Sequence, residues 1–153
     1  LTFDCFKEGF FIPTNLYIIG TMNDIDKSVE AFDFALRRRF EWIEVMAKDV
    51  AKDSLTEMLT NANTTQIDDL VAKINALNDV ISNEGKSFGL SDAYHIGHAY
   101  FKNVDVNDPL SLEKIFNRNI VSILREYTRG RDTEYVDEFI ENCAIALGVN
   151  YNK

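Results

Sequence analysis

The run Leu16-Tyr17-Ile18-Ile19 constrains the fold of this chain more than any other feature. It is continuously apolar and lacks the alternation of polar and apolar residues that marks a half-exposed strand. Such a run is typical of a strand buried on both faces of a parallel sheet. Residues 40–45 alternate more clearly and indicate a second short strand. Residues 25–36 carry apolar side chains at helical spacing, so we expect a strand–helix–strand unit of a parallel α/β sheet.

The pattern changes after Met46, and the rest of the chain is typical of helices. Residues 49–60 and 66–82 predict two helices, and the second has an apolar stripe. Asp108-Pro109 predicts another helix start, with Asp as the cap and Pro at the first position. A last helix should begin at Asp132 and end at Gly148. The inward residues that we expect on it are Tyr135, Val136, Phe139, Ile140, Cys143 and Leu147.

Asn23 and Asp26 follow the first expected strand. Ligands bind beyond the carboxyl ends of the strands of an open parallel sheet. An amide there can donate to a phosphate oxygen and accept from an attacking water, which orients the water. Alternatively, Asn23 satisfies its own backbone in a turn. Asp26 either caps the next helix or lies beside a bound nucleotide.

Three consecutive arginines, Arg37 to Arg39, end the expected helix. Cations at a helix C-terminus are stabilised by the dipole, so one or two of them need no functional explanation. Three in a row fan over roughly 200° of the helix and cannot share one partner. One could anchor locally on Asp33 while another points toward a phosphate of a neighbouring subunit.

Three motifs in this chain, NLYIIGTMN at residues 15–23, DFALRRRF at 33–40 and HIGHAYF at 95–101, resemble the McrB family. McrB is the motor subunit of a methylcytosine-dependent restriction system. The resemblance implies an α+β fragment: the closing strands and helix of an AAA+ α/β P-loop NTPase core, followed by an all-helical lid. Residues 1–46 would be the C-terminal part of the α/β subdomain, and residues 47–153 the lid.

The resemblance also implies roles for single residues. Asn23 corresponds to sensor 1, and Arg38 and Arg39 correspond to the arginine finger that acts on the neighbouring subunit's nucleotide. Asp26 and His98 are expected near the nucleotide. Many AAA+ proteins place a sensor-2 arginine near the start of a lid helix, and this chain has the histidine motif instead. His98 is therefore either a nucleotide neighbour or a packing residue that fixes the lid.

The cofactor and partners that the resemblance implies for the full-length parent are GTP or ATP with Mg²⁺, a homo-oligomeric, hexameric ring, and an McrC-like endonuclease subunit. This chain has no G-x-x-x-x-G-K-[ST] motif. Its only Gly-Lys-Ser, Gly85-Lys86-Ser87, follows an apolar helical pattern with Val80 at the place of the first glycine. No apolar run ends in Asp-Glu. We expect a fragment that starts after the metal-binding strand and that alone hydrolyses nothing and binds no nucleotide tightly.

The composition of the chain argues against several functional classes of protein. The formal charge of −9 and the scattered basic residues argue against direct DNA binding by this chain, so we expect DNA to bind through other domains. No run reaches the roughly 18 apolar residues of a membrane helix, and we expect a cytoplasmic protein. Cys5 and Cys143 lack metal-ligand spacing and are expected as buried thiols. The alternatives are a MoxR-like or other AAA+ ATPase or chaperone, and a non-catalytic helical interaction module.

Overall fold

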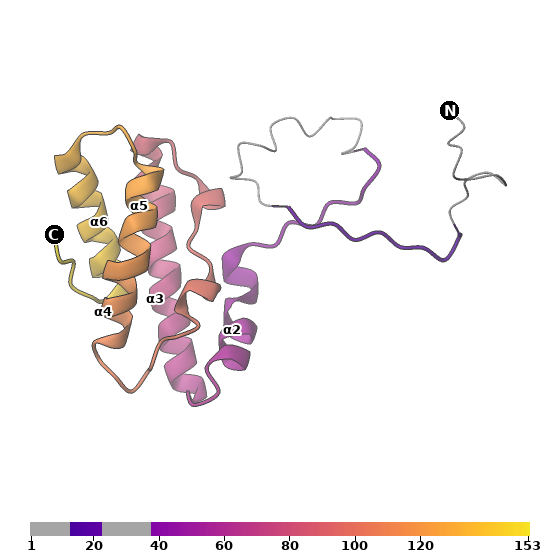
Figure 1. The fold of residues 1–153 in the computed structure, drawn as a ribbon, viewed down its shortest axis with the longest axis horizontal. Helices are drawn as coiled ribbons and strands as arrows, with labels where there is room; N and C mark the ends of the chain where they lie inside the picture. The colour runs from indigo at the N-terminus through magenta and orange to yellow at the C-terminus, as the bar shows by residue number, and fades with distance from the viewer. Residues whose placement is uncertain (1–12, 23–37) are drawn as a thin grey trace, which may run out of the picture. The chain divides into compact units, whose positions relative to one another are not determined.

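The computed structural model describes residues 13–22 and 38–153 of the chain (Figure 1). The chain divides into two compact units, residues 1–31 and 32–153. In the first unit, the described residues begin with a turn in which the Leu16 amide donates to the Pro13 carbonyl oxygen at 3.2 Å. The residues from Leu16 to Met22 then have no regular secondary structure.

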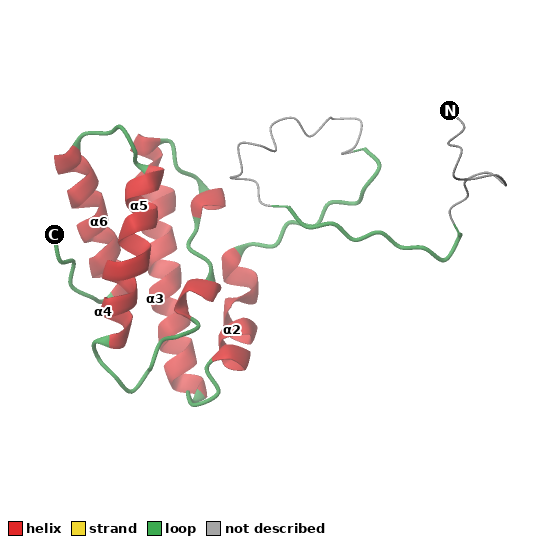
Figure 2. Cartoon of the chain, viewed as in Figure 1, coloured by secondary structure: helices red, strands yellow, loops and turns green. Residues whose placement is uncertain are grey.

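Neither expected strand forms, and the α+β fold class is wrong. Residues 13–22 and 38–153 contain helices, turns and loops only (Figure 2). In the first segment Tyr17 is 86% exposed and Ile19 92%, and in the second Ile43 is 80% exposed. A strand is held by ladder hydrogen bonds to its neighbours, and the described residues offer neither segment a partner. The fold described here is all-helical. The helix expected at 25–36 lies outside the described residues.

The two helices expected after Met46 are confirmed, each beginning two residues earlier than predicted. They are α2 (Ala47–Met58) and α3 (Thr64–Asn83). Asn63 caps α3: its Oδ1 accepts from the Gln66 amide at 3.0 Å, and the Asn63 amide donates to Gln66 Oε1 at 2.9 Å. This reciprocal pair satisfies two amides that the first turn of a helix leaves without partners.

Helix α3 forms the centre of the helical unit and lies beside α6, with which it shares its most extensive contacts (Figure 1). Its apolar stripe is buried as the spacing predicts, and Leu77 and Ile81 have no exposed surface. The core residues contributed by this stripe are Ile67, Leu70, Ile74, Leu77 and Ile81, with Val71 at the edge. The amphipathic pattern therefore identified the buried face of α3 correctly.

The connection between α3 and α4 consists of loops and short 3₁₀ turns: η2 (Gly85–Phe88), η3 (Asp92–Tyr94) and η4 (His98–Phe101). A helical segment follows as α4 (Ser111–Ile115), a π-helical turn η5 (Phe116–Ile120) and α5 (Val121–Tyr127). The helix expected from Asp108-Pro109 starts later, at Ser111. Asp108 instead closes a turn, because its Oδ1 accepts from the Leu110 amide at 2.9 Å.

Helix α6 (Thr133–Leu147) begins and ends where the sequence predicts. The Asp132 side chain accepts from the Glu134 amide at 2.9 Å, and Gly148 ends the helix at φ +77°. Val136, Phe139, Ile140, Cys143 and Leu147 are buried. The inward position expected for Tyr135 is wrong: this side chain is 66% exposed and lines a surface pocket beside the start of α6.

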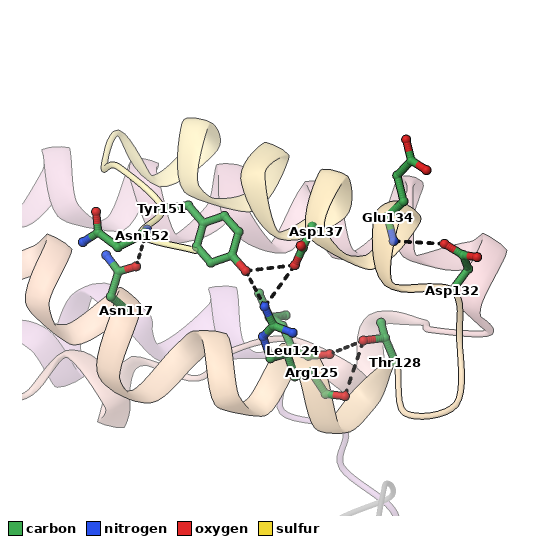
Figure 3. A network of polar contacts seen from close by, with 9 residues as sticks. All are labelled: Asn117, Leu124, Arg125, Thr128, Asp132, Glu134, Asp137, Tyr151 and Asn152. Atoms are coloured by element: carbon green, nitrogen blue, oxygen red, sulfur yellow. Dashed lines mark hydrogen bonds and ion pairs between the residues drawn. The ribbon is translucent and has the colours of Figure 1, made fainter.

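The chain after α6 folds back along α4 and η5 and is held by polar side chains (Figure 3). Asn117 donates to the Asn150 carbonyl oxygen and accepts from the Asn152 amide, both at 2.8 Å. Tyr151 is 9% exposed, and its hydroxyl contacts Arg125 and Asp137. The C-terminal residues therefore join α5 and α6. None of the described helices is both long and apolar enough to cross a membrane.

Candidate functional site: the histidine segment

Residues 92–98, the histidine segment, are attached to α3 through Asn78. Asn78 Nδ2 donates to the Ile96 carbonyl oxygen at 3.1 Å, and the Ile96 amide donates to Asn78 Oδ1 at 2.7 Å. Asn78 is 3% exposed and Ile96 is fully buried. The amide thus satisfies both backbone groups of a buried residue, which fixes the segment in position without regular secondary structure.

One turn further along α3, Ser82 contacts both ionisable side chains of the segment. Its Oγ donates to Asp92 Oδ1 at 2.5 Å and lies 2.6 Å from His95 Nε2. A hydroxyl has one proton, and here it is given to the carboxylate. Nε2 must then be the donor to Oγ, so His95 carries a proton on Nε2.

The Ser82 hydrogen bond is also the main reason why the pKa of Asp92 lies below its ordinary value. Desolvation, the second-largest effect, raises the pKa of this carboxyl, and the charges of His95, Lys48 and Lys86 lower it further. Asp92 is an exposed side chain, so this carboxylate stays ionised at the surface while Ser82 and His95 lie beneath it.

Serine, histidine and aspartate meet here, but in the wrong order for a nucleophilic triad. In such a triad the histidine Nε2 accepts the serine proton and the carboxylate holds the proton on Nδ1. Here the carboxylate of Asp92 takes the hydroxyl proton. His95 Nδ1 is buried and has no hydrogen-bond partner among the described residues. His95 is therefore not placed to take the Ser82 proton, and the contacts attach Asp92 and His95 to α3 as a structural clasp.

His98 follows this clasp at the start of η4. The side chain is partly buried, and its Nδ1 is buried without a hydrogen-bond partner in the part of the chain that the structure describes. The two residues that end η4 differ in position: Phe101 is fully buried in the core, whereas Tyr100 is 45% exposed. The contacts at Asn78 and Ser82 thus hold the segment that carries His98, whose role stays a prediction.

Of the other predicted site residues, the structure describes only Arg38 and Arg39. Arg38 and Arg39 lie in an exposed turn. Among residues 13–22 and 38–153, no hydrogen bond or ion pair joins either arginine to the histidine segment. Asn23 and Asp26 lie outside the described residues. No group of three or more potential metal ligands occurs in the described parts of the chain.

Sequence reasoning missed Asn78, Ser82, Asp92 and His95 as a connected group. Asn78 carried a signal, since it follows Leu77 and precedes Ile81 on the apolar stripe of α3. A polar residue on a buried face needs a hydrogen-bond partner, which makes it a marker of an attached segment. Ser82 and Asp92 carried none, because both belong to residue types that usually lie in loops and at helix ends.

Helices α2 to α6 form an all-helical unit that holds the histidine segment, and a family match gives the class of this part of the chain as a helical lid. Residues 69–135 match the family described as McrB, alpha-helical lid domain. The type IV methyl-directed restriction enzyme EcoKMcrB subunit of Escherichia coli (strain K12) is 34% identical over 126 residues. The alignment covers 79% of this chain and 27% of that relative. The chain is an McrB-like protein, which confirms the resemblance. No solved structure matches the chain.

Proposed function

We propose that this chain supplies nucleotide-hydrolysis residues and the lid of an McrB-like NTPase in a restriction system for DNA with modified cytosine. The observation that carries the proposal is the match of residues 69–135 to the McrB lid. The restriction subunit from Escherichia coli, 34% identical over 126 residues, supports the same assignment. The chain spans about a quarter (27%) of that relative's length, so the activity concerns the full-length parent.

In this proposal the parent hydrolyses GTP or ATP with Mg²⁺ in a homo-oligomeric, hexameric ring. An McrC-like endonuclease subunit is its partner, and DNA binds through domains outside this chain. Asn23 orients the attacking water as sensor 1, with Asp26 close to the nucleotide. Arg38 or Arg39 reaches the phosphate of the neighbouring subunit. Such a finger stabilises charge on the transferring phosphoryl group and accelerates hydrolysis by about 10³–10⁵ in known systems.

The lid holds His98 at the nucleotide in this arrangement. The hydrogen bonds between Asn78 and Ile96 and between Ser82 and His95 fix the segment just before His98. Because these bonds already order the backbone that leads into His98, nucleotide binding need not order it, which favours a positioning role for the clasp. His98 contacts the nucleotide in the parent, and the core residue Phe101 keeps η4 in place.

The arginines give the sharpest test, because a finger acts on the neighbouring subunit. Full-length parent with Arg39→Ala or Arg38→Ala should still bind nucleotide but hydrolyse it slowly in assembled rings. Mixing either variant with a P-loop lysine variant should restore part of the activity, since some junctions then combine an intact P-loop with an intact finger. Arg129→Ala is the matched control, because Arg129 is a 77% exposed arginine paired with Glu126.

Wild-type turnover of both single variants in assembled rings would refute the finger. It would favour the helical interaction module, in which the arginines only match a helix dipole and contribute at most about 1 kcal/mol each to stability. Hydrolysis that needs the arginines but is indifferent to an endonuclease subunit and to cytosine modification would favour the MoxR-like or other AAA+ alternative.

A further inference from the structure

A pocket of about 410 Å³ opens between the end of α3, the turn η2 and the first turns of α6. It lies outside the histidine segment and the arginine turn. Phe88 and Phe139 form its apolar wall, with ring centroids 5.2 Å apart. Tyr135, 66% exposed, stands at its edge. The volume falls in the range of ordinary ligand sites, and an aromatic wall with polar groups around it is their usual composition.

Two hydrogen bonds between distant parts of the chain hold the rim of this pocket. Asn142 Nδ2 donates to Glu84 Oε2 at 2.8 Å, which fixes one carboxylate and leaves its second oxygen available. Arg131 donates to the Phe88 carbonyl oxygen at 3.4 Å, a long and weak contact. The Glu84 carboxylate is therefore placed before any ligand arrives, and binding need not order it.

The side chains that line the pocket include three acids and one base, and the described part of the chain shows no ion pair for any of the four. Glu84, Asp132 and Glu138 face a single cation, Arg131. Elsewhere the described residues form ion pairs between neighbouring acids and bases, such as Lys52 with Asp68 and Arg125 with Asp137. Within those same residues, none of the four charged side chains at the pocket takes part in an ion pair. An incoming cation would thus find carboxylates that no internal base occupies.

We propose that this pocket binds an arginine side chain presented by another protein. A guanidinium group is planar and carries five donors, so it can stack on the tyrosine ring at the edge and still donate to carboxylates such as Glu84 and Glu138, which the compact ammonium of a lysine does less well. The surface beyond the pocket favours a protein segment over a free small cation. Ile145 lies two turns after Glu138 on the same face of α6 and is 67% exposed, so it can accept an apolar residue beside the arginine.

The proposal is independent of nucleotide hydrolysis and is tested on the 153-residue chain. The ¹⁵N-labelled protein is titrated with the blocked peptide Gly-Leu-Arg-Gly and with the same peptide carrying citrulline, a neutral isostere of arginine. We expect saturable shifts at the Asn142 side-chain amide and at the amides of Ser87 and Gly89. The citrulline peptide should bind at least about tenfold more weakly, because the charge-assisted bonds are lost.

Glu138→Gln should weaken binding of the arginine peptide several-fold. Glu57→Gln on α2 is the matched control, since it makes the same charge change on an exposed residue that does not line the pocket, and should have no effect. Equal weakening by both variants, or equal binding of both peptides, would overturn the site and indicate general attraction to an acidic chain. If the same signals move on concentrating the protein without peptide, the occupant is a second copy, and the partner assignment fails.

Discussion

Asn78 and Ile96 form a closed pair of hydrogen bonds between positions eighteen residues apart, at 3.1 and 2.7 Å, inside the core of the helical unit. The pair replaces the ladder that a buried extended segment would otherwise need. Because of this pair, the chain between α3 and His98 can be buried at Ile96 while both the amide and the carbonyl of Ile96 keep a hydrogen-bond partner. The histidine segment of this lid has only 3₁₀ turns, and this buried pair attaches it to α3.

Replacing Asn78 tests this relationship. Asn78→Ala leaves the amide and carbonyl of Ile96 buried without partners, so the free energy of unfolding should fall by about 2–4 kcal/mol. Urea denaturation followed by circular dichroism measures it. Asn75→Ala on the same helix is the control, because Asn75 is partly exposed and should change stability by less than about 0.5 kcal/mol. A loss below about 1 kcal/mol for Asn78→Ala would mean that water replaces the amide.

The clasp at Ser82 predicts a titration change. The Ser82 hydrogen bond is the largest cause of the lowered pKa of Asp92, so Ser82→Ala should raise that pKa toward the ordinary value. Carboxyl ¹³C NMR between pH 2 and 7 measures both states. Asp108 provides an internal control: the Leu110 amide and Lys114 lower its pKa, and Ser82→Ala should leave it unchanged.

The sign of the pH effect at Asp92 follows from the same shift. A carboxyl with a folded-state pKa below its unfolded value stabilises the fold above the unfolded pKa, and this contribution is lost as the pH falls through the folded pKa. Ser82→Ala should therefore lessen the acid sensitivity of the unfolding free energy. An unchanged Asp92 titration would show that Ser82 donates elsewhere in solution, for example to His95.

The parts of the fold that the sequence predicted are those decided by local chemistry. Asp132 and Gly148 delimit α6 because a short acceptor satisfies first-turn amides and glycine tolerates the left-handed end. The stripe of α3 follows because an apolar face must be buried wherever its partners come from. The ends of α6 and the buried face of α3 can therefore be predicted without knowing which elements pack against these helices.

The predictions that were wrong, and the contacts that were missed, depend on residues far apart in the sequence. The run from Leu16 to Ile19 has the composition of a buried strand, but a strand depends on neighbouring strands that its own residues do not specify. Tyr135 has the helical spacing of an inward residue but lies at the pocket. Where the core ends along α6 depends on η2 and Phe88, which the sequence of α6 does not specify. The clasp of Ser82, Asp92 and His95 joins residues whose types also suit ordinary loops, so only the folded arrangement reveals it.

Cys143 predicts a second pH dependence, at the alkaline end. Burial, followed by the charge of Glu84, raises the pKa of this thiol far above its ordinary value. Above a pH of about 8.5, the unfolded thiol loses a proton that the folded one keeps, so the unfolding free energy falls with a slope of at most about 1.4 kcal/mol per pH unit. Urea denaturation from pH 7.5 to 10 should show this slope, and Cys143→Ala should reduce it. Equal slopes in both proteins would show that the thiol ionises in the folded state.

Tyr151 supplies the last prediction. Its hydroxyl donates to Asp137 at 3.0 Å and accepts from Arg125 at 2.6 Å, and Arg125 also contacts Asp137 at 3.0 Å (Figure 3). Tyr151→Phe should lower the free energy of unfolding by about 0.5–1.5 kcal/mol, because it removes the hydroxyl that joins the tail to α5 and α6. The ion pair between Arg125 and Asp137 remains in this variant. A double-mutant cycle with Asp137→Asn should then show a coupling of at least about 0.5 kcal/mol. Tyr135→Phe, at an exposed tyrosine, is the matched control. Additive losses would mean that the tail is held by its hydrogen bonds to Asn117 and Glu113 and by burial of the ring.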